Sequence, residues 1–389
     1  MKIAILTPWS ISPDAVGGTE RFVMDLAESF KLLGNFVDVY MLSGKGYVKN
    51  DINYLNINLF NTDDTIDEYF LRKKFDDFST IESYENLAHK IEKLIDFEKY
   101  DLVQINSQLF LKICEKKKRI FTIHTNPFEY KLDFGEKSFD CMLKLMKIES
   151  KYEDTKFVIP SMYYSNEYNL LTGVKINYIP HAIDISRIIN DRKRKEILDE
   201  LNIDYSKKII LLPSRLEPVQ KQPMLFMKAF SMLDDFTKNK FKIICTGADK
   251  QYLQYKNDIE KYCIKNNIDI MITRFKDMSD AFKIADIVVL PSQSESFGYA
   301  ALESLSLGIM TIMNDIPTFK EIAGGSKNNY FFYNSIDSLY KLLNSSINKN
   351  LERISQPKNW QDKYSIIKFG LRYLNLIYYR SLLIFWIMI

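Results

Sequence analysis

Cysteine is scarce in this chain, which contains four cysteines in 389 residues. They are scattered along the sequence without a pairing pattern, so a disulfide-stabilised secreted domain is excluded and a reduced, cytoplasmic protein is expected. No Cys-x-x-Cys pair and no Cys/His cluster occurs, which excludes the usual zinc sites. The four residues are Cys114, Cys141, Cys245 and Cys263.

The chain also lacks a large excess of either basic or acidic residues. The 53 basic and 50 acidic residues give a net charge of +3, so the sequence carries no electrostatic footprint for nucleic acid. The opening residues MKIAILTP are expected to form a strand and not a signal peptide, because no basic segment followed by a long apolar core is present there.

Long hydrophobic runs are few, and the clearest is the C-terminal segment Ser381–Ile389, which is almost purely apolar. At ~1.5 Å rise per residue it is far too short to cross a hydrocarbon core of ~30 Å. Two interpretations of this tail stay open. It packs on the body of the protein, or it contacts a membrane or a partner.

Hydrophobic residues make up 46% of the chain, which is ample for two cores, and the length favours two domains. Short apolar strands alternate with helices in both halves, which predicts an α/β fold with parallel sheets covered on both faces. The charged run Asp191–Glu200 is expected to be a solvated helix and linker. The predicted strands are Lys2–Leu6, Val37–Leu42, Leu102–Ile105, Ile120–Ile123, Phe157–Pro160, Ile176–Pro180, Lys208–Leu212, Lys242–Cys245, Ile268–Ile272, Ile287–Leu290 and Ile309–Met313.

Helices are expected between these strands. The first is predicted over Thr19–Leu33, with Thr19 as its N-cap and Gly34 as its stop. In the second half, the predicted helices are Pro223–Leu233, Gln251–Asn267 and Met278–Ile284.

The most informative segment is PSQSESFGYAALESLSLG, residues Pro291–Gly308. A buried strand, a polar loop and a predicted helix, Tyr299–Leu307, follow one another here. The carboxyl end of a parallel strand is where such sheets bind ligands, and the free N–H groups of a helix start suit a phosphate. Glu295 and Glu303 can grip hydroxyls at two points of an extended ligand, and Gly298 permits a close backbone approach. These features describe a sugar nucleotide.

This segment resembles the E-x7-E motif of retaining glycosyltransferases of family 4, which have the GT-B fold. The family form reads roughly PS-x-x-EGFG-x-x-x-LEA-x-x-x-G, and this chain departs from it at Ser296 and Ser304, both small-residue changes. The segment Ile179–Asp184, IPHAID, resembles the interdomain hinge of the family. The segment that begins at Asn359 resembles its closing Trp and the helix that crosses back onto the N-terminal domain.

The resemblance implies two doubly wound, Rossmann-like domains that face a central cleft. Residues 1–184, with 360–389 crossing back onto them, would bind the acceptor. Residues 185–359 would bind a nucleotide-sugar donor, such as a UDP- or GDP-sugar. The implied reaction is hexosyl transfer with retention of anomeric configuration.

The resemblance also assigns roles within the motif. Glu295 would contact the transferred sugar and Glu303 would hold the ribose hydroxyls of the nucleotide. The backbone of Ser296, Phe297 and Gly298 would contact the sugar and the phosphate.

Two basic residues follow the predicted strand Lys208–Leu212. A diphosphate leaving group gains negative charge as the glycosidic bond breaks, and Arg215 and Lys221 are cations that can stabilise it. The family reads R-L-x-x-x-K at this place, and this chain has one more residue between the two.

In the first half, Gly17 and Gly18 precede a helix and permit positive φ and close backbone approach. With Glu20 they match the family's G-G-x-E, which lies beside the donor phosphate and the acceptor. Glu20 could instead be a helix N-terminal carboxylate. His124 follows a strand where the family often has a histidine beside the reacting sugar. No role is predicted for the other two histidines, His89 and His181.

No Asp-x-Asp pair, which metal-dependent transferases of another fold use to hold a divalent cation on the diphosphate, occurs in the sequence. We therefore expect no metal and no cofactor besides the donor substrate. Alternatives are a GT-B sugar-nucleotide epimerase, a phosphorylase with a lysine-bound pyridoxal phosphate, and a catalytically silent partner of another transferase.

The family's commonest role is cell-surface polysaccharide assembly, which implies a polysaccharide or lipid-linked glycan acceptor. The chain would then be cytoplasmic, and it would attach peripherally to the inner face of the plasma membrane if the tail binds lipid. Nothing in the sequence identifies the sugar, the base or the linkage.

The membrane interpretation of the tail is testable by co-sedimentation with anionic liposomes. If the apolar tail enters the interface, where Trp386 is well suited to lie, the full chain sediments with the vesicles and a chain truncated after Arg380 stays in the supernatant. If both remain in the supernatant, the tail has a structural role instead.

Overall fold

The computed structural model describes residues 1–12, 17–60, 68–247, 250–327, 329–346 and 351–386, with the side chains at 68–69, 250, 346 and 379–386 excepted. The predicted tail contacts at 382–389 therefore lie outside the described side chains. The chain forms two compact units. Met1–Ala182 and Lys363–Ile389 make up the first, and Ile183–Asp362 makes up the second. The sequence analysis placed the first boundary two residues later, after residue 184.

The first unit is built on an eight-stranded sheet of order β3-β4-β2-β1-β5-β6-β7-β8, in which every neighbouring pair is parallel except β3 and β4. The strands are β1 Lys2–Thr7, β2 Phe36–Met41, β3 Tyr47–Lys49, β4 Ile52–Asn56, β5 Leu102–Ile105, β6 Arg119–Thr122, β7 Thr155–Ile159 and β8 Ile176–Tyr178. The helices are α1 Gly18–Leu32, α2 Glu68–Lys74, α3 Ile81–Glu92, α4 Pro127–Phe134, α5 Glu136–Glu149, α6 Met162–Thr172 and α16 Ile366–Trp386.

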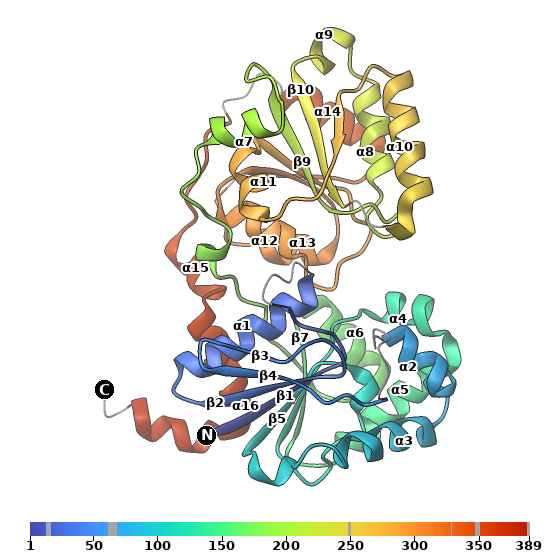
Figure 1. Cartoon of the computed structure of the whole chain (residues 1–389), viewed down its shortest axis with the longest axis vertical. Helices are drawn as coiled ribbons and strands as arrows, with labels where there is room; N and C mark the ends of the chain where they lie inside the picture. The colour runs from blue at the N-terminus through green and yellow to red at the C-terminus, as the bar shows by residue number, and fades with distance from the viewer. Residues whose placement is uncertain (13–16, 61–67, 248–249, 328, 347–350, 387–389) are drawn as a thin grey trace. The chain divides into compact units, whose positions relative to one another are not determined.

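Both faces of this sheet are covered (Figure 1). The apolar sides of α3, α5 and α6 join strand residues such as Val103, Phe121 and Phe157 in one core. Helix α1 and the C-terminal helix α16 pack against each other through the ring contacts that Phe22 and Phe30 make with Tyr373. The last helix of the chain is therefore part of the first unit.

The start of α1 differs from the prediction. The N-cap is Gly17, which has no side chain to accept a hydrogen bond, and Thr19 lies inside the first turn. The Thr19 hydroxyl instead donates to Glu20 Oε2 at 3.1 Å. The predicted stop is confirmed, because Gly34 follows the helix with a φ of +80°.

The second unit contains a six-stranded, fully parallel sheet of order β11-β10-β9-β12-β13-β14. Its strands are β9 Lys208–Arg215, β10 Phe241–Gly247, β11 Ile270–Ile272, β12 Ile287–Leu290, β13 Met310–Asn314 and β14 Tyr330–Tyr333. Its helices are α7 Arg194–Glu200, α8 Pro223–Ser231, α9 Asp235–Lys238, α10 Leu253–Lys265, α11 Met278–Ile284, α12 Tyr299–Ser306, α13 Pro317–Ala323 and α14 Ile336–Ser346, with α15 Lys358–Lys363 at the junction of the units.

Residues of β9 alternate between the two faces of this sheet. Ile210 and Leu212 join the core formed with α8, α10 and α14, while Ile209 and Leu211 alternate with them and are buried on the other face, and α11 also packs against β9 (the helices are labelled in Figure 1). The predicted doubly wound α/β architecture is thus confirmed. The sequence analysis did not expect β3, β4 or β14, which are three to five residues long and are not buried along their whole length.

Each sheet has one point at which the strand order reverses. In the first unit the chain runs outward from β1 to β2 and β4, then resumes at β5 on the other side of β1. In the second unit it runs from β9 to β10 and β11, then resumes at β12 beside β9. The loops that leave such neighbouring strands in opposite directions open a crevice at their carboxyl ends, where α/β proteins bind ligands.

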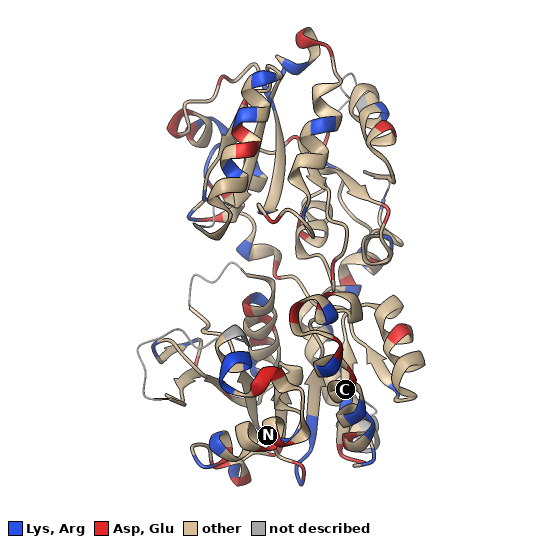
Figure 2. Cartoon of the chain, turned by 90° about the vertical axis from the view of Figure 1, so that its right-hand side faces the viewer, with Lys and Arg blue, Asp and Glu red and all other residues tan. Residues whose placement is uncertain are grey.

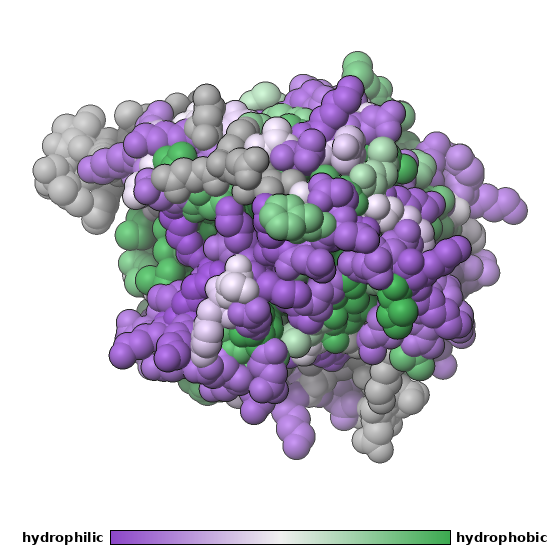
Figure 3. All heavy atoms as spheres, turned by 90° about the horizontal axis from the view of Figure 1, so that it is seen from above, coloured by the Kyte–Doolittle hydropathy of each residue, from purple (hydrophilic) through white to green (hydrophobic). Residues whose placement is uncertain are grey.

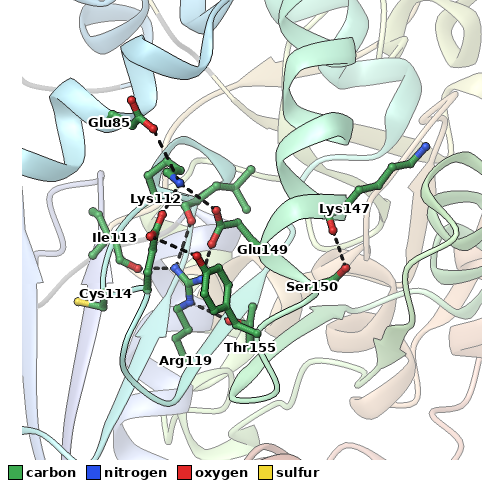
Figure 4. A network of polar contacts seen from close by, with 12 residues as sticks. Glu85, Lys112, Ile113, Cys114, Arg119, Lys147, Glu149, Ser150 and Thr155 are labelled. Atoms are coloured by element: carbon green, nitrogen blue, oxygen red, sulfur yellow. Dashed lines mark hydrogen bonds and ion pairs between the residues drawn. The ribbon is translucent and has the colours of Figure 1, made fainter.

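A buried ionic network lies at the amino ends of β6 and β7 in the first sheet (Figure 4). Arg119 and Glu149 are both fully buried and form an ion pair. Arg119 also donates to Thr155 Oγ1 at 2.9 Å and to the Ile113 carbonyl at 2.7 Å. Lys112 lies 3.3 Å from the second Glu149 oxygen. Burial of these charges is tolerated because each is paired and hydrogen-bonded.

Charges of both signs are distributed over both units (Figure 2). The face of the protein in Figure 3 is largely hydrophilic, with hydrophobic residues in small groups. All four cysteines are buried and unpaired. None of the helices in the described ranges combines the length and the apolar character that a membrane span requires.

The Arg119–Glu149 pair yields a stability prediction. Replacing Glu149 by Ala leaves a buried guanidinium without its counter-charge, so the free energy of unfolding should fall by about 3–5 kcal/mol. Urea denaturation measures this loss. The control is Glu136→Ala, which breaks the exposed Lys131–Glu136 pair and should match the wild type within error. Equal stabilities of the two variants would show that the buried pair contributes nothing.

Candidate functional site

The candidate donor site lies in the second unit, where two loops meet at the strand-order reversal. We call residues 215–222 the β9 loop and residues 291–298 the β12 loop. Their strands are parallel neighbours, with Ile287 opposite Ile210. Two hydrogen bonds tie the loops together: the Gln293 N–H donates to the Gln220 carbonyl at 2.7 Å, and the side chain of Gln222 donates to that of Gln293 at 2.9 Å.

An ion pair between Lys221 and Glu295 is the strongest link between the loops. Lys221 Nζ lies 2.6 Å from Glu295 Oε1, and the two side chains are only 13% and 16% exposed. The Ser292 hydroxyl donates to the same carboxylate oxygen at 2.7 Å. The structure therefore brings together two residues that the sequence analysis placed on different parts of the donor, the diphosphate and the sugar.

Arg215 ends β9 with an exposed side chain, for which we find no hydrogen bond or ion pair with the described residues. Gly247, at the end of β10, makes this position possible. A Cβ at Gly247 would lie 2.3 Å from the Arg215 Cα, so only glycine permits the two backbones to pass. The guanidinium is thus available to an anionic ligand.

The β12 loop leads into α12 through Gly298, which has a φ of +100°. A Cβ there would lie 2.9 Å from the ring of Phe319 on α13, so glycine is required by helix packing as well as by the turn. The Phe297 side chain is buried and contacts the Tyr299 ring edge-on at 5.2 Å. Ser296, before it, is partly exposed.

Glu303 lies in the second turn of α12 and is 5% exposed. Helix α12 follows the β12 loop directly, so both glutamates of the E-x7-E segment belong to one strand–loop–helix unit, as the sequence predicted. At this exposure, little of the Glu303 side chain is accessible from the solvent.

In the first unit, His124 follows β6 and lies in an aromatic cluster. Its ring contacts those of Trp9 at 5.6 Å and Phe22 at 4.6 Å. The ring of His181, for which the sequence predicted no role, is 5.8 Å from His124 and 4.5 Å from Phe22. The two histidines come from segments far apart in the sequence, so only the tertiary fold pairs them.

Both of these histidines are kept neutral. Burial lowers the pKa of His124 to about 3. Burial and the neighbouring His124 hold the pKa of His181 well below its usual range. Although His124 as a whole is half-buried, its Nε2 is buried without a hydrogen-bond partner in the described structure. A neutral imidazole can position a hydroxyl but cannot act as a resident cation.

In the structure Gly17 is the N-cap of α1 and Gly18 is its first residue. Neither Gly17 nor Gly18 has a positive φ. A Cβ on Gly17 would lie 2.0 Å from Glu20 Oε2, so a larger residue here would displace the Glu20 carboxylate, which folds over Gly17. Glu20 is the acidic residue of the first helical turn, which is the alternative that the sequence left open.

A group of buried polar side chains near His124 escaped the sequence analysis. Gln104, Asn106 and Asn126 are fully buried at the carboxyl ends of β5 and β6, and Gln108 is 5% exposed. Each has one side-chain polar atom that lacks a hydrogen-bond partner in the described part of the protein. Amides are poor signals in a sequence, because most of them lie in loops without any function.

The candidate donor site also contains residues that the sequence analysis missed. Glu217 accepts backbone hydrogen bonds from Val219 at 3.0 Å and from Lys221 at 3.1 Å. Gln293 joins the two loops, as described above. In the sequence, only the extra residue between Arg215 and Lys221 indicated that the β9 loop requires additional hydrogen bonds of its own. Over the described residues, no group of three or more His, Cys, Asp or Glu side chains has metal-binding geometry.

Comparison with known proteins identifies the class. Residues 193–363 match the family described as Glycosyl transferases group 1. Over 277 residues, the chain is 24% identical to the UDP-Gal:alpha-D-GlcNAc-diphosphoundecaprenol alpha-1,3-galactosyltransferase of Escherichia coli, which covers 65% of this chain and 67% of that protein. The chain spans only 31% and 43% of the lengths of two further glycosyltransferase relatives.

Solved structures show the same fold over nearly the whole chain. Sucrose-phosphate synthase from Thermosynechococcus elongatus has a TM-score of 0.71 at 14% identity and covers 98% of this chain and 99% of its own. HepE of Anabaena, in complex with UDP and glucose, has a TM-score of 0.68 at 13% identity over 96% of this chain and 98% of its own. The resemblance noted in the sequence is confirmed in two respects: the chain has the GT-B fold over nearly its whole length, and its second unit carries the group 1 glycosyltransferase domain.

The neutral state of His124 predicts a pH dependence of stability. Between about pH 6.5 and pH 3 the unfolded chain binds a proton at this residue that the folded chain does not. Stability should therefore decrease as the pH falls below about 6.5, by at most about 1.4 kcal/mol per pH unit for each such histidine, and His124 should contribute no slope above that range.

Urea denaturation between pH 7.5 and pH 5 measures this slope. His124→Gln should reduce it, with the remainder due in part to His181, while His89→Gln on the exposed side of α3 should leave it unchanged. A wild-type slope in the His124 variant would mean that the buried imidazole is protonated in the folded chain.

Proposed function

We propose that this glycosyltransferase transfers a hexose from a nucleotide-sugar donor, such as a UDP- or GDP-sugar, to a hydroxyl of a glycan acceptor, with retention of anomeric configuration. The observation that carries the proposal is the convergence of Arg215, Lys221 and Glu295 at the strand-order reversal of the second unit. Two cations and a carboxylate there match the diphosphate and the hydroxyls of such a donor.

The roles of the residues follow from the charge that develops in the reaction. As the bond between the sugar C1 and the phosphate oxygen breaks, the departing diphosphate gains negative charge. Arg215, which is exposed and has no ion pair with the described residues, and Lys221 would stabilise that charge. Glu295 would hold a hydroxyl of the transferred sugar, the N–H groups at the start of α12 would bind phosphate, and Glu303 would hold the ribose.

Retention requires the acceptor oxygen to bond to C1 on the face that the phosphate leaves. In this front-face route the acceptor hydroxyl loses its proton to the departing phosphate oxygen, so no enzyme nucleophile is needed. This route rests on the resemblance to family 4.

The first unit would supply the acceptor side. Neutral His124 and the buried amides of Gln104, Asn106 and Asn126 are groups that hydrogen-bond uncharged hydroxyls. The name of the Escherichia coli relative specifies a lipid diphosphate-linked sugar as its acceptor. By analogy we propose a lipid-linked or polysaccharide glycan acceptor and a cytoplasmic protein that attaches peripherally to the membrane through its apolar tail.

A thermal-shift screen against nucleotides and nucleotide sugars tests the function directly. A ligand at 100 times its dissociation constant adds about 2.7 kcal/mol of apparent stability, which identifies the donor. Donor hydrolysis and transfer are then measured with that compound. Binding without any turnover would favour a silent partner subunit, and the absence of any stabilising nucleotide would contradict the proposal.

Glu303 tests the assigned nucleotide contact. Replacing it by Gln keeps the size of this buried side chain but removes the charge that would accept two ribose hydroxyls. We expect the donor affinity to fall at least about tenfold, or about 1.4 kcal/mol, as measured by calorimetry. Glu260→Gln on α10, which breaks only a surface pair with Lys256, is the matched control. Unchanged affinity in Glu303→Gln would assign the ribose to another residue.

The proposal also includes activity without a metal ion, because Arg215 and Lys221 can take the place of a divalent cation at the diphosphate. Transfer rates should be equal with and without excess chelator. Loss of activity on chelation that magnesium or manganese restores would refute this part of the proposal.

A further inference from the structure

The β9 loop has an internal support that its length makes necessary. It carries one more residue between Arg215 and Lys221 than the family pattern R-L-x-x-x-K, so its path must differ locally. The carboxylate of Glu217 lies inside this path. Its Oε1 accepts the N–H of Val219 at 3.0 Å, and its Oε2 accepts the N–H groups of Gln220 and of Lys221, the latter at 3.1 Å.

These hydrogen bonds fix the direction of the following peptide groups. With these N–H groups directed inward at Glu217, the Gln220 carbonyl accepts the N–H of Gln293 in the β12 loop at 2.7 Å. Lys221 then starts from a backbone held at its own N–H, and its ammonium reaches Glu295 at 2.6 Å. Charge-assisted hydrogen bonds of this kind are about twice as strong as neutral ones.

The next residue shows that the loop is held against a conformational preference. Gln222 has φ 46° and ψ 47°, the left-handed region that non-glycine residues seldom adopt. Its N–H donates to the Glu217 carbonyl at 3.1 Å, and its side chain reaches Gln293. Such conformations persist where the surrounding contacts over-determine them, and Glu217 contributes contacts from both its side chain and its backbone.

We propose that Glu217 is a positioning residue of the donor site, which places the Lys221 ammonium for the diphosphate and holds the β9 loop against the β12 loop. The proposal rests on the function proposed above and deepens it. Glu217 itself contacts neither donor nor acceptor in this scheme. It acts through Lys221.

Glu217→Gln is the sharpest variant, because its amide would present N–H donors to backbone N–H groups that now share a carboxylate. We expect kcat to fall by about tenfold to a hundredfold, the scale of a misplaced catalytic group, with KM for the donor changed far less. In a Lys221→Ala background the same substitution should cause no further loss, since the residue it positions is gone. Additive losses in the double variant would overturn the proposal.

Asp234→Asn is the matched control. Asp234 also accepts a backbone N–H, that of Thr237 at 2.9 Å, but it caps α9 before the amino end of β10. This variant should keep the wild-type kcat and KM. If its kcat fell as much as that of Glu217→Gln, the loss in Glu217→Gln would be due to general destabilisation of the protein, and the proposal would be overturned.

A second readout does not depend on activity. Lys221 is 13% exposed and paired, so its acylation by acetic anhydride, followed by mass spectrometry, should be slow in the wild type and several-fold faster in Glu217→Gln. Equal labelling rates would overturn the positioning role. Faster labelling in a protein that turns over no nucleotide sugar would support the positioning of Lys221 and refute the proposed function alone.

Discussion

The ion pair between Lys221 and Glu295 is the contact on which the candidate donor site depends. It joins two loops that leave neighbouring strands, β9 and β12, although 74 residues separate its members along the chain. Both side chains are mostly buried, so separating the two charges would leave each of them buried and unpaired, which is strongly unfavourable. A donor that brings a diphosphate to the lysine and hydroxyls to the glutamate can replace the pairing on both sides. The free site therefore keeps its shape without leaving a charge uncompensated.

Much of the fold could be predicted, because parallel strands buried on both faces appear as apolar runs. Ile287–Leu290 and Met278–Ile284 were predicted with the bounds that the structure gives them. The strands β3, β4 and β14 could not be recognised, since they are three to five residues long and none is buried along its whole length. The N-cap at Thr19 was wrong because propensity alone cannot register that Glu20 folds back over Gly17.

The candidate site was predictable where a motif fixes both residue type and spacing. Glu295 and Glu303 lie on the strand–loop–helix unit that the motif implied, and Arg215 and Lys221 lie at the end of β9 and in the loop after it. The contact between Lys221 and Glu295 was not predictable, because it depends on the register of β9 against β12. Glu217 escaped for another reason: it acts on backbone N–H groups, which every residue has, so the sequence around it carries no distinctive partner.

Because the C-terminal helix α16 belongs to the first unit, the order of translation affects how that unit folds. The rings of Phe22 and Phe30 are covered by Tyr373, whose hydroxyl also lies 2.9 Å from the Thr122 hydroxyl on β6. The 180 residues of the second unit, 183–362, must be translated before that helix exists. At about 5–20 residues per second, a nascent first unit would wait about 10–40 s with its α1 face uncovered. The second unit, which is continuous in sequence, can complete its core first, and the first unit closes only after α16 has left the ribosome.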